Sequence, residues 1–202
     1  MASRTILTPE GRCAFMHVFE PSTDPFGGVS YSVRLMFPKT MNMAWIEDAW
    51  KAVCIEEFKT ATPPGLRPLY SKDPEQDKGF IQDGDLRYQT APIEKKPLYE
   101  AYRENWIVPL KTSPEAPPAV VGPDKVEIVD RSAFASGDYA RAVIEVSAYT
   151  MKRLSKPMVS VRLRAIQKTR DGERFSGGVS ASQAVEMLDE VAVGPTNIED
   201  VF

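Results

Sequence analysis

The segment from Tyr139 to Arg174 limits the possible folds more than any other part of the chain. Residues 140–149 and 158–168 both alternate between small or aliphatic and polar side chains, which is typical of strands with one buried face. The residues expected to face inward are Ala140, Ala142, Ile144, Val146 and Ala148 in the first arm, and Val159, Val161, Leu163 and Ala165 in the second. Ile166 interrupts the polar face. The segment therefore predicts a β-hairpin with one buried and one exposed face.

Cations and tyrosines occupy the exposed face of this hairpin and the connection between its arms. They are Tyr139, Arg141 and Tyr149 in the first arm, Arg162, Arg164 and Lys168 in the second, and Lys152, Arg153 and Lys156 in the connection. Because cations neutralise phosphates and aromatic rings stack on bases, this surface suits a polyanion with unpaired bases. A solvated strand face that binds nothing is the alternative interpretation.

The net charge of −3 conceals an asymmetry along the chain. Cations far outnumber acidic residues between residues 139 and 174, and no Lys or Arg follows Arg174. The acidic residues after that point are Glu186, Asp189, Glu190, Glu199 and Asp200. A basic segment followed by an acidic tail fits a nucleic-acid-binding protein despite the mildly negative total.

A chain of 202 residues is long enough for one hydrophobic core, so we expect one domain over residues 1–178 and a disordered acidic tail over 179–202. No apolar run approaches the roughly 20 residues of a membrane span, and the N-terminus lacks a secretion signal. These features predict an intracellular protein without membrane association. Cys13 and Cys54 are accordingly expected to be reduced and half-buried, although a disulfide is not excluded.

The rest of the chain predicts further strands and one long helix. The expected strands are residues 11–20, 29–37, 99–110 and 126–129. The strand at 99–110 places Tyr102 and Trp106 in one phase. A helix capped by Thr40 is expected to run to about Lys59. Residues 61–96 show no clear periodicity and are interpreted as a long insertion. The order fits a mainly β fold, a five-stranded oligonucleotide-binding barrel with an early helix.

Several short motifs occur in the order found in a phage and prophage family first catalogued as a domain of unknown function. They are Gly11-Arg12, His17-Val18-Phe19-Glu20-Pro21, Tyr31-Ser32-Val33, Phe37-Pro38-Lys39, Asp83-Gly84-Asp85, Ser136-Gly137-Asp138-Tyr139-Ala140-Arg141 and Gln167-Lys168-Thr169-Arg170-Asp171-Gly172-Glu173. That family resembles phage single-stranded-DNA-binding proteins, which have an oligonucleotide-binding barrel and an acidic tail ending in phenylalanine. The resemblance implies sequence-independent binding of single-stranded DNA during phage replication and recombination, in the cytoplasm of the infected host.

The last residues resemble the terminal peptide with which such proteins recruit replication and recombination partners. Glu199, Asp200 and Phe202 are the partner-binding residues that this resemblance implies. A disordered solubilising end is the alternative, but an exposed phenylalanine serves no solubility purpose, whereas an aromatic ring beside carboxylates is a compact ligand for an apolar pocket with a basic rim. Whether the protein forms a homodimer stays open.

The sequence predicts a binding protein and not an enzyme. The only histidine, His17, has no nucleophile or metal-ligating partner at a suitable spacing, and Asp83-Gly84-Asp85 is first of all a turn signal, so no catalytic residue, metal or cofactor is expected. The predicted DNA-binding residues are Arg34, Tyr102, Trp106, Arg141, Tyr149, Lys152, Arg153, Arg162, Arg164 and Lys168. The alternative function is that of a phage structural or adaptor protein whose small barrel binds other proteins.

Overall fold

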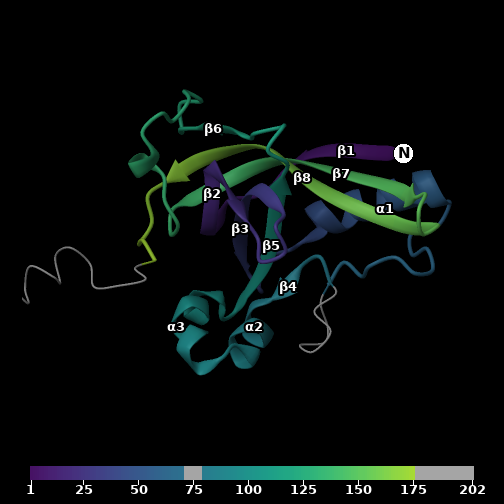
Figure 1. The fold of residues 1–202 in the computed structure, drawn as a ribbon, viewed down its shortest axis with the longest axis horizontal. Helices are drawn as coiled ribbons and strands as arrows, with labels where there is room; N and C mark the ends of the chain where they lie inside the picture. The colour runs from purple at the N-terminus through teal and green to yellow at the C-terminus, as the bar shows by residue number, and fades with distance from the viewer. Residues whose placement is uncertain (71–78, 176–202) are drawn as a thin grey trace, which may run out of the picture.

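The computed structural model describes residues 1–70 and 79–175, which form a mainly β fold (Figure 1). The strands are β1 (Ala2–Leu7), β2 (Gly11–Thr23), β3 (Val29–Pro38), β4 (Gln82–Asp83), β5 (Asn105–Thr112), β6 (Ala119–Val121), β7 (Tyr139–Met151) and β8 (Lys156–Arg170). The helices are α1 (Ala44–Phe58), α2 (Gly84–Thr90) and α3 (Lys96–Tyr99), with 3-10 turns at Ile93–Lys95, Glu100–Tyr102 and Arg131–Ala133. No helix in these two ranges is long and apolar enough to cross a membrane.

Five of the strands pair in a closed ring. β2 pairs with β3, β3 with β5, β8 with β7 and β7 with β2, all antiparallel, and the parallel pair of β5 and β8 completes the circle. β1 pairs with β7 and β6 with β8, so both extend the sheet beyond the ring. The sequence-based prediction of a mainly β fold is confirmed.

The interior of the ring is filled by the alternate aliphatic residues that the sequence pattern predicts. Val33, Leu35 and Phe37 of β3 pair with Leu110, Val108 and Trp106 of β5, and Ile144 and Val146 of β7 pair with Leu163 and Val161 of β8. Helix α1 packs on β1 and β7 and contributes Ile46, Trp50 and Val53 to the same core. In Figure 1, α2 and α3 lie apart from this core, below the sheet where β5 begins.

A β-bulge in β8 explains the residue that did not fit the hairpin pattern. Val143 pairs with Ala165, but the next residue, Ile144, pairs with Leu163, so Arg164 is the extra residue in β8. The bulge reverses the alternation, and Leu163 and Ile166 are therefore both fully buried. The prediction that Ala165 faces inward is wrong, because Ala165 lies beyond the bulge and is only half-buried.

Several predicted element boundaries are also wrong. Helix α1 begins at Ala44 after Met43 and not after Thr40, and the predicted strand at 126–129 is replaced by β6, which lies within the proline-rich loop. The segment expected to be aperiodic, residues 61–96, contains β4 and α2 and ends where α3 begins, so the fold has more than one helix. The carboxylate of Asp83 caps α2 by accepting from the backbone N–H groups of Asp85 and Leu86.

The start of β7 and the end of β8 are joined by an interlock made of Gly137, Asp138, Lys168 and Gly172. Asp138 is 1% exposed and accepts hydrogen bonds from the backbone N–H groups of Ala135 and Gly172, both at 3.0 Å, and lies 3.2 Å from the Lys168 ammonium. A Cβ on Gly172 would lie 2.1 Å from the carbonyl oxygen of Gly137. Two of the motifs that carry the family resemblance therefore encode one tightly packed junction.

This interlock makes the stability of the folded protein depend on pH in the acidic range. Burial alone would raise the pKa of Asp138, but the N–H donors and the Lys168 ammonium together lower it. A carboxyl whose folded pKa is lowered contributes stability that is complete above its unfolded pKa of about 3.9 and is lost as the pH falls through the folded value. We expect Asp138→Asn to lower the free energy of unfolding by about 2 kcal/mol at pH 7, and by less at pH 3, which lies below the unfolded pKa.

Urea unfolding at both pH values measures this effect. Asp171→Asn is the matched control, because the Asp171 carboxylate also contacts Lys168 but is 89% exposed, so little change is expected at either pH. Equal destabilisation by Asp138→Asn at pH 7 and pH 3 would contradict the assignment.

Candidate nucleic-acid interface

The β7–β8 hairpin and the connection between its strands carry seven of the ten residues that the sequence predicted to bind DNA. Directly paired residues on neighbouring strands point to the same side, and the register pairs Glu145 with Arg162, Tyr149 with Met158 and Arg141 with Gln167. Arg141, Tyr149 and Arg162 therefore share one face of the sheet, as the sequence pattern predicts.

Intramolecular partners occupy part of this basic face. The Nε of Arg164 donates to Glu145 at 2.8 Å, and the Nε of Arg141 donates to the Gln167 side chain at 2.9 Å. Lys168 pairs with the buried Ala140 and lies in the interlock with Asp138, where its side chain is only 12% exposed, so the prediction that it shares the exposed face with Arg162 is wrong. Arg164 also lowers the pKa of Glu145, so this carboxylate is charged beside it at neutral pH. These cations are partly neutralised before any ligand arrives.

Other cations near the hairpin have no such partners. Lys152, Arg153 and Lys156 are exposed at the hairpin tip, and within residues 1–70 and 79–175 none of them forms an ion pair or a side-chain hydrogen bond. Arg162 is also exposed, and its register partner across the β5–β8 contact is another exposed cation, Lys111, which sequence reasoning missed. The open positive charge thus runs from the β5–β8 contact along β8 to the tip.

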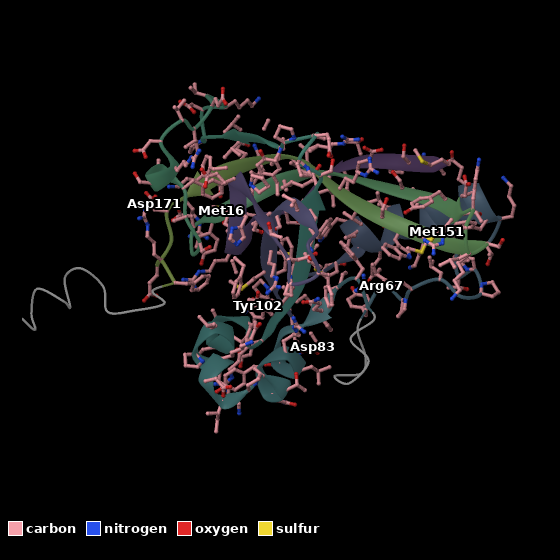
Figure 2. The ribbon with its side chains drawn as sticks, viewed as in Figure 1. Met16, Arg67, Asp83, Tyr102, Met151 and Asp171 are labelled. Atoms are coloured by element: carbon pink, nitrogen blue, oxygen red, sulfur yellow. The ribbon has the colours of Figure 1, made fainter. Side chains whose placement is uncertain are left out.

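Tyr102 and Trp106 do not join this surface. Tyr102 lies in a 3-10 turn before β5 and is 1% exposed, so the prediction that it shares a strand phase with Trp106 is wrong. Trp106 pairs with Phe37 on the inner side of the ring, packs on the main core and contacts Tyr70 at a centroid distance of 5.1 Å. Figure 2 places Tyr102 where the ring meets the lobe of α2 and α3, far from Met151 at the hairpin tip.

A second aromatic surface forms around Tyr102 on the outside of the ring. Phe15 lies at a bulge in β2 with a φ of 47°, a left-handed conformation that bulky side chains rarely adopt. Its ring packs at 6.0 Å from the rings of both Tyr102 and Tyr99. The predicted residue Arg34 lies 4.8 Å from the Phe15 ring centre and donates to the Tyr102 hydroxyl at 2.9 Å. Arg34 is therefore half-buried in this aromatic cluster.

A cavity of about 610 Å³ opens beside this cluster, and we call it the β2 cavity. Its lining includes Arg12, Phe15, Leu98, Tyr102, Arg174 and Phe175. Arg12 is held by the interlock, because its guanidinium donates to the carbonyls of Gly137 at 3.1 Å and Glu173 at 2.5 Å. The same guanidinium lies 4.2 Å from the Phe175 ring centre.

Sequence reasoning missed Arg12, Phe15 and Phe175 as site residues. Arg12 lies in one of the quoted motifs and Phe175 follows another, so the sequence contained a signal. Phe15 appeared only as one alternating residue of a strand, and the bulge that turns it outward depends on pairing with β3. Together these residues combine fixed cations with exposed aromatic area.

Metal binding has little support among the described side chains. The carboxylates of Asp83 and Asp85 both contact the Lys39 ammonium at 2.7 Å, so this ammonium already occupies the space between them. No group of three His, Cys, Asp or Glu residues in the described ranges is arranged to hold a metal ion. Cys13 and Cys54 are free and buried, and burial raises the pKa of Cys13 to about 12, which keeps it a neutral thiol.

The protein is similar to single-stranded-DNA-binding proteins of bacteriophages. The single-stranded-DNA-binding protein from bacteriophage Enc34 in complex with ssDNA is 21% identical over 85% of this chain and 89% of that chain, with a TM-score of 0.59. Gp2.5, a single-stranded DNA binding protein encoded by bacteriophage T7, is 12% identical over 96% and 100% of the two chains, with a TM-score of 0.51. A search of curated proteins finds no match. These structural likenesses agree in fold with the ring described above.

A family model described as the Enterobacter phage Enc34 ssDNA-binding protein matches residues 4–193, which is nearly the whole chain. The tail residues Glu199, Asp200 and Phe202 lie outside both this match and the described residues. The family suggested by the short sequence motifs is thereby confirmed. The chain belongs to the family of the Enterobacter phage Enc34 single-stranded-DNA-binding protein.

Proposed function

We propose that this protein binds single-stranded DNA without sequence preference, with residues 1–178 as the binding domain, and that its ring is an oligonucleotide-binding barrel. Such barrels bind nucleic acid on their second and third strands and on the loops after the first and fourth strands. In the order of this ring, those elements are β3, β5, the turn at residues 24–28 and the hairpin tip at residues 152–155. Family membership supports the same ligand.

The observation that carries the proposal is the line of cations that form no ion pair and no side-chain hydrogen bond within the described residues. It consists of Lys111, Arg162, Lys156, Lys152 and Arg153. Such a line can follow a phosphate backbone, and Tyr149, half-buried on the same face, offers a ring to one base. Stacking on a ring requires unpaired bases, so duplex DNA is expected to bind much more weakly. The protein would act in phage DNA replication and recombination in the host cytoplasm.

Salt dependence tests this function directly. We expect the affinity for a fluorescent oligo-dT, followed by anisotropy, to fall with a log–log slope of about −0.7 for each phosphate neutralised. If the five cations each contact one phosphate, the affinity falls roughly 100-fold between 50 and 200 mM salt. A duplex of equal length is the control. Failure to bind the single strand at 50 mM salt would contradict the proposal and favour the adaptor function.

We further propose that the acidic tail recruits replication or recombination proteins through Glu199, Asp200 and Phe202. The tail has the opposite charge to the hairpin surface, so it can also compete with DNA there. Deleting the residues after Gly194 is expected to tighten oligo-dT binding severalfold at 50 mM salt, with little effect at 300 mM, because salt screens the competition. Equal affinity of the full-length and shortened chains at 50 mM salt would reject the competition.

A further inference from the structure

The β2 cavity differs from the hairpin surface in its chemistry. Two rings, those of Phe15 and Phe175, are half-buried in its wall, and both can offer aromatic area to a ligand. Arg12 and Arg174 add positive charge at the same wall, which also carries Glu173 and Glu100, the latter paired with Arg103 at 2.8 Å. The hairpin surface offers mainly cations and Tyr149, because the ring of Tyr139 is covered by Arg170 at 3.4 Å. The volume of about 610 Å³ lies in the range of pockets that enclose a small organic ligand.

The arginines of the cavity are fixed in place by the fold. The hydrogen bonds from Arg12 to the Gly137 and Glu173 carbonyls hold its guanidinium over Phe175, and Arg174 donates to the Ser132 carbonyl at 2.7 Å. Both arginines retain further N–H donors, because a guanidinium carries five. A ligand that combines a flat ring with a nearby anion could therefore use both the aromatic and the cationic parts of the wall.

The backbone of Phe15 adds a second, independent indication of a ligand. A bulky residue in the left-handed region costs on the order of 1–3 kcal/mol, which glycine or asparagine would largely avoid. Backbone strain of this kind occurs most often at functional sites, where a side chain is held in a particular direction. The bulge in β2 aims the Phe15 ring outward, against Tyr102 and into the cavity, and not toward the core of the ring.

We propose that the β2 cavity binds one unstacked nucleobase of single-stranded DNA, with its ring against Phe15 or Phe175 and the adjoining phosphate near Arg12 and Arg174. This inference rests on the proposed function and adds a site on β2 that sequence reasoning did not identify. A bound strand would extend from the hairpin surface to this cavity. Figure 2 shows that Met151 at the hairpin tip and Met16 beside the cavity lie well apart along the long axis.

Two single substitutions test the site in the full-length protein. Phe15→Asn removes the ring but tolerates the left-handed backbone, and Phe175→Ala removes a half-buried ring near the end of the described chain. The variant that removes the stacking ring is expected to weaken oligo-dT binding about tenfold at 50 mM salt, because the base–aromatic stack is lost. Phe15→Tyr and Phe175→Tyr are the conservative comparisons, since both keep a ring and should recover most of the affinity that the ring-deleted variant at the same position loses.

A crosslinking experiment locates the base without relying on the variants. Oligo-dT containing 5-iodouracil is irradiated with the unchanged protein, and the crosslinked peptides are identified by mass spectrometry. We expect crosslinks to Phe15 or Phe175. Thermal unfolding of each variant, followed by circular dichroism, verifies that a loss of affinity does not reflect a loss of folding.

The outcomes separate this inference from the proposed function. If the unchanged protein binds oligo-dT, both ring-deleted variants bind within twofold of it and the crosslinks map elsewhere, the cavity assignment is overturned while DNA binding stands. If the unchanged protein does not bind oligo-dT at all, the proposed function itself fails. Weaker binding by at least one of the two variants together with crosslinks in the cavity supports the assignment.

Discussion

Gly172→Ala is expected to lower the free energy of unfolding by about 3 kcal/mol, which corresponds to about 9 °C in the midpoint of thermal unfolding. The added Cβ would lie 2.1 Å from the carbonyl oxygen of Gly137 and 3.0 Å from its carbonyl carbon. These are backbone atoms at the start of β7, so they cannot turn away as a flexible side chain would. Relief requires that the two strand ends separate, which would weaken the contacts of Asp138.

Circular dichroism at neutral pH measures this effect, with Gly27→Ala as the matched control. Gly27 has a φ of 84°, but no atom lies within 4 Å of its hypothetical Cβ, so the substitution adds backbone strain without a clash. We expect the control to cost about 1 kcal/mol. If Gly172→Ala lowers the unfolding midpoint no more than Gly27→Ala does, the close contact between Gly172 and Gly137 is not tight enough to resist a methyl group.

Reversing two charges at the hairpin tip is expected to have the largest effect on DNA binding. In the double variant Lys152→Glu/Arg153→Glu, two contacts to phosphate become repulsions, and the affinity for oligo-dT should fall about 100-fold at 50 mM salt. The log–log salt slope should become shallower by about 1.4, because two fewer phosphates are neutralised. Both side chains are exposed, so the thermal unfolding midpoint should stay nearly constant.

The matched control for this variant is Lys51→Glu/Lys95→Glu. It changes the net charge equally at two exposed positions, one on α1 and one in the 3-10 turn before α3. We expect a decrease of only a few-fold from the general change in charge. Equal losses of affinity in the two double variants would mean that net charge, and not the hairpin tip, governs binding.

Two variants of the hairpin compare a cation that has no hydrogen-bond partner with one that is already paired to a carboxylate. Arg162→Ala should weaken oligo-dT binding more than the double variant Glu145→Ala/Arg164→Ala, although Arg162 and Arg164 are only two positions apart. The double variant removes a bonded pair and leaves the net charge unchanged, whereas Arg162 is exposed without a hydrogen-bond partner among the described residues. Parallel titrations with oligo-dT at one salt concentration give the ratio of the two dissociation constants.

The parts of the fold that depend on local alternation could be predicted from the sequence. The arms of the hairpin and the strand that begins at Val29 follow a period of two, and the observed strands start and end within a few residues of the predicted bounds. β1 was not predicted from the sequence, because it lies at the edge of the sheet, where most of its side chains are exposed and no burial pattern is imposed on them.

The candidate site was harder to predict because it depends on tertiary contacts. Tyr102 lies near a strand in sequence, but its ring is buried between the ring of strands and the lobe of α2 and α3. The outward direction of Phe15 follows from a bulge that exists only when β2 pairs with β3. Likewise, nothing in the local sequence indicates that Glu145 binds Arg164 and leaves Arg162 open.

The parallel contact between β5 and β8 closes the ring through a single residue pair, Lys111 with Arg162. Two like charges placed opposite each other on neighbouring strands repel, so the circle is held least firmly there. A phosphate bound between the two cations would attract both of them and would hold β5 and β8 together at this point. Bound DNA is therefore expected to slow amide hydrogen exchange in both strands at this point, and the ligand would complete the closure of the protein that binds it.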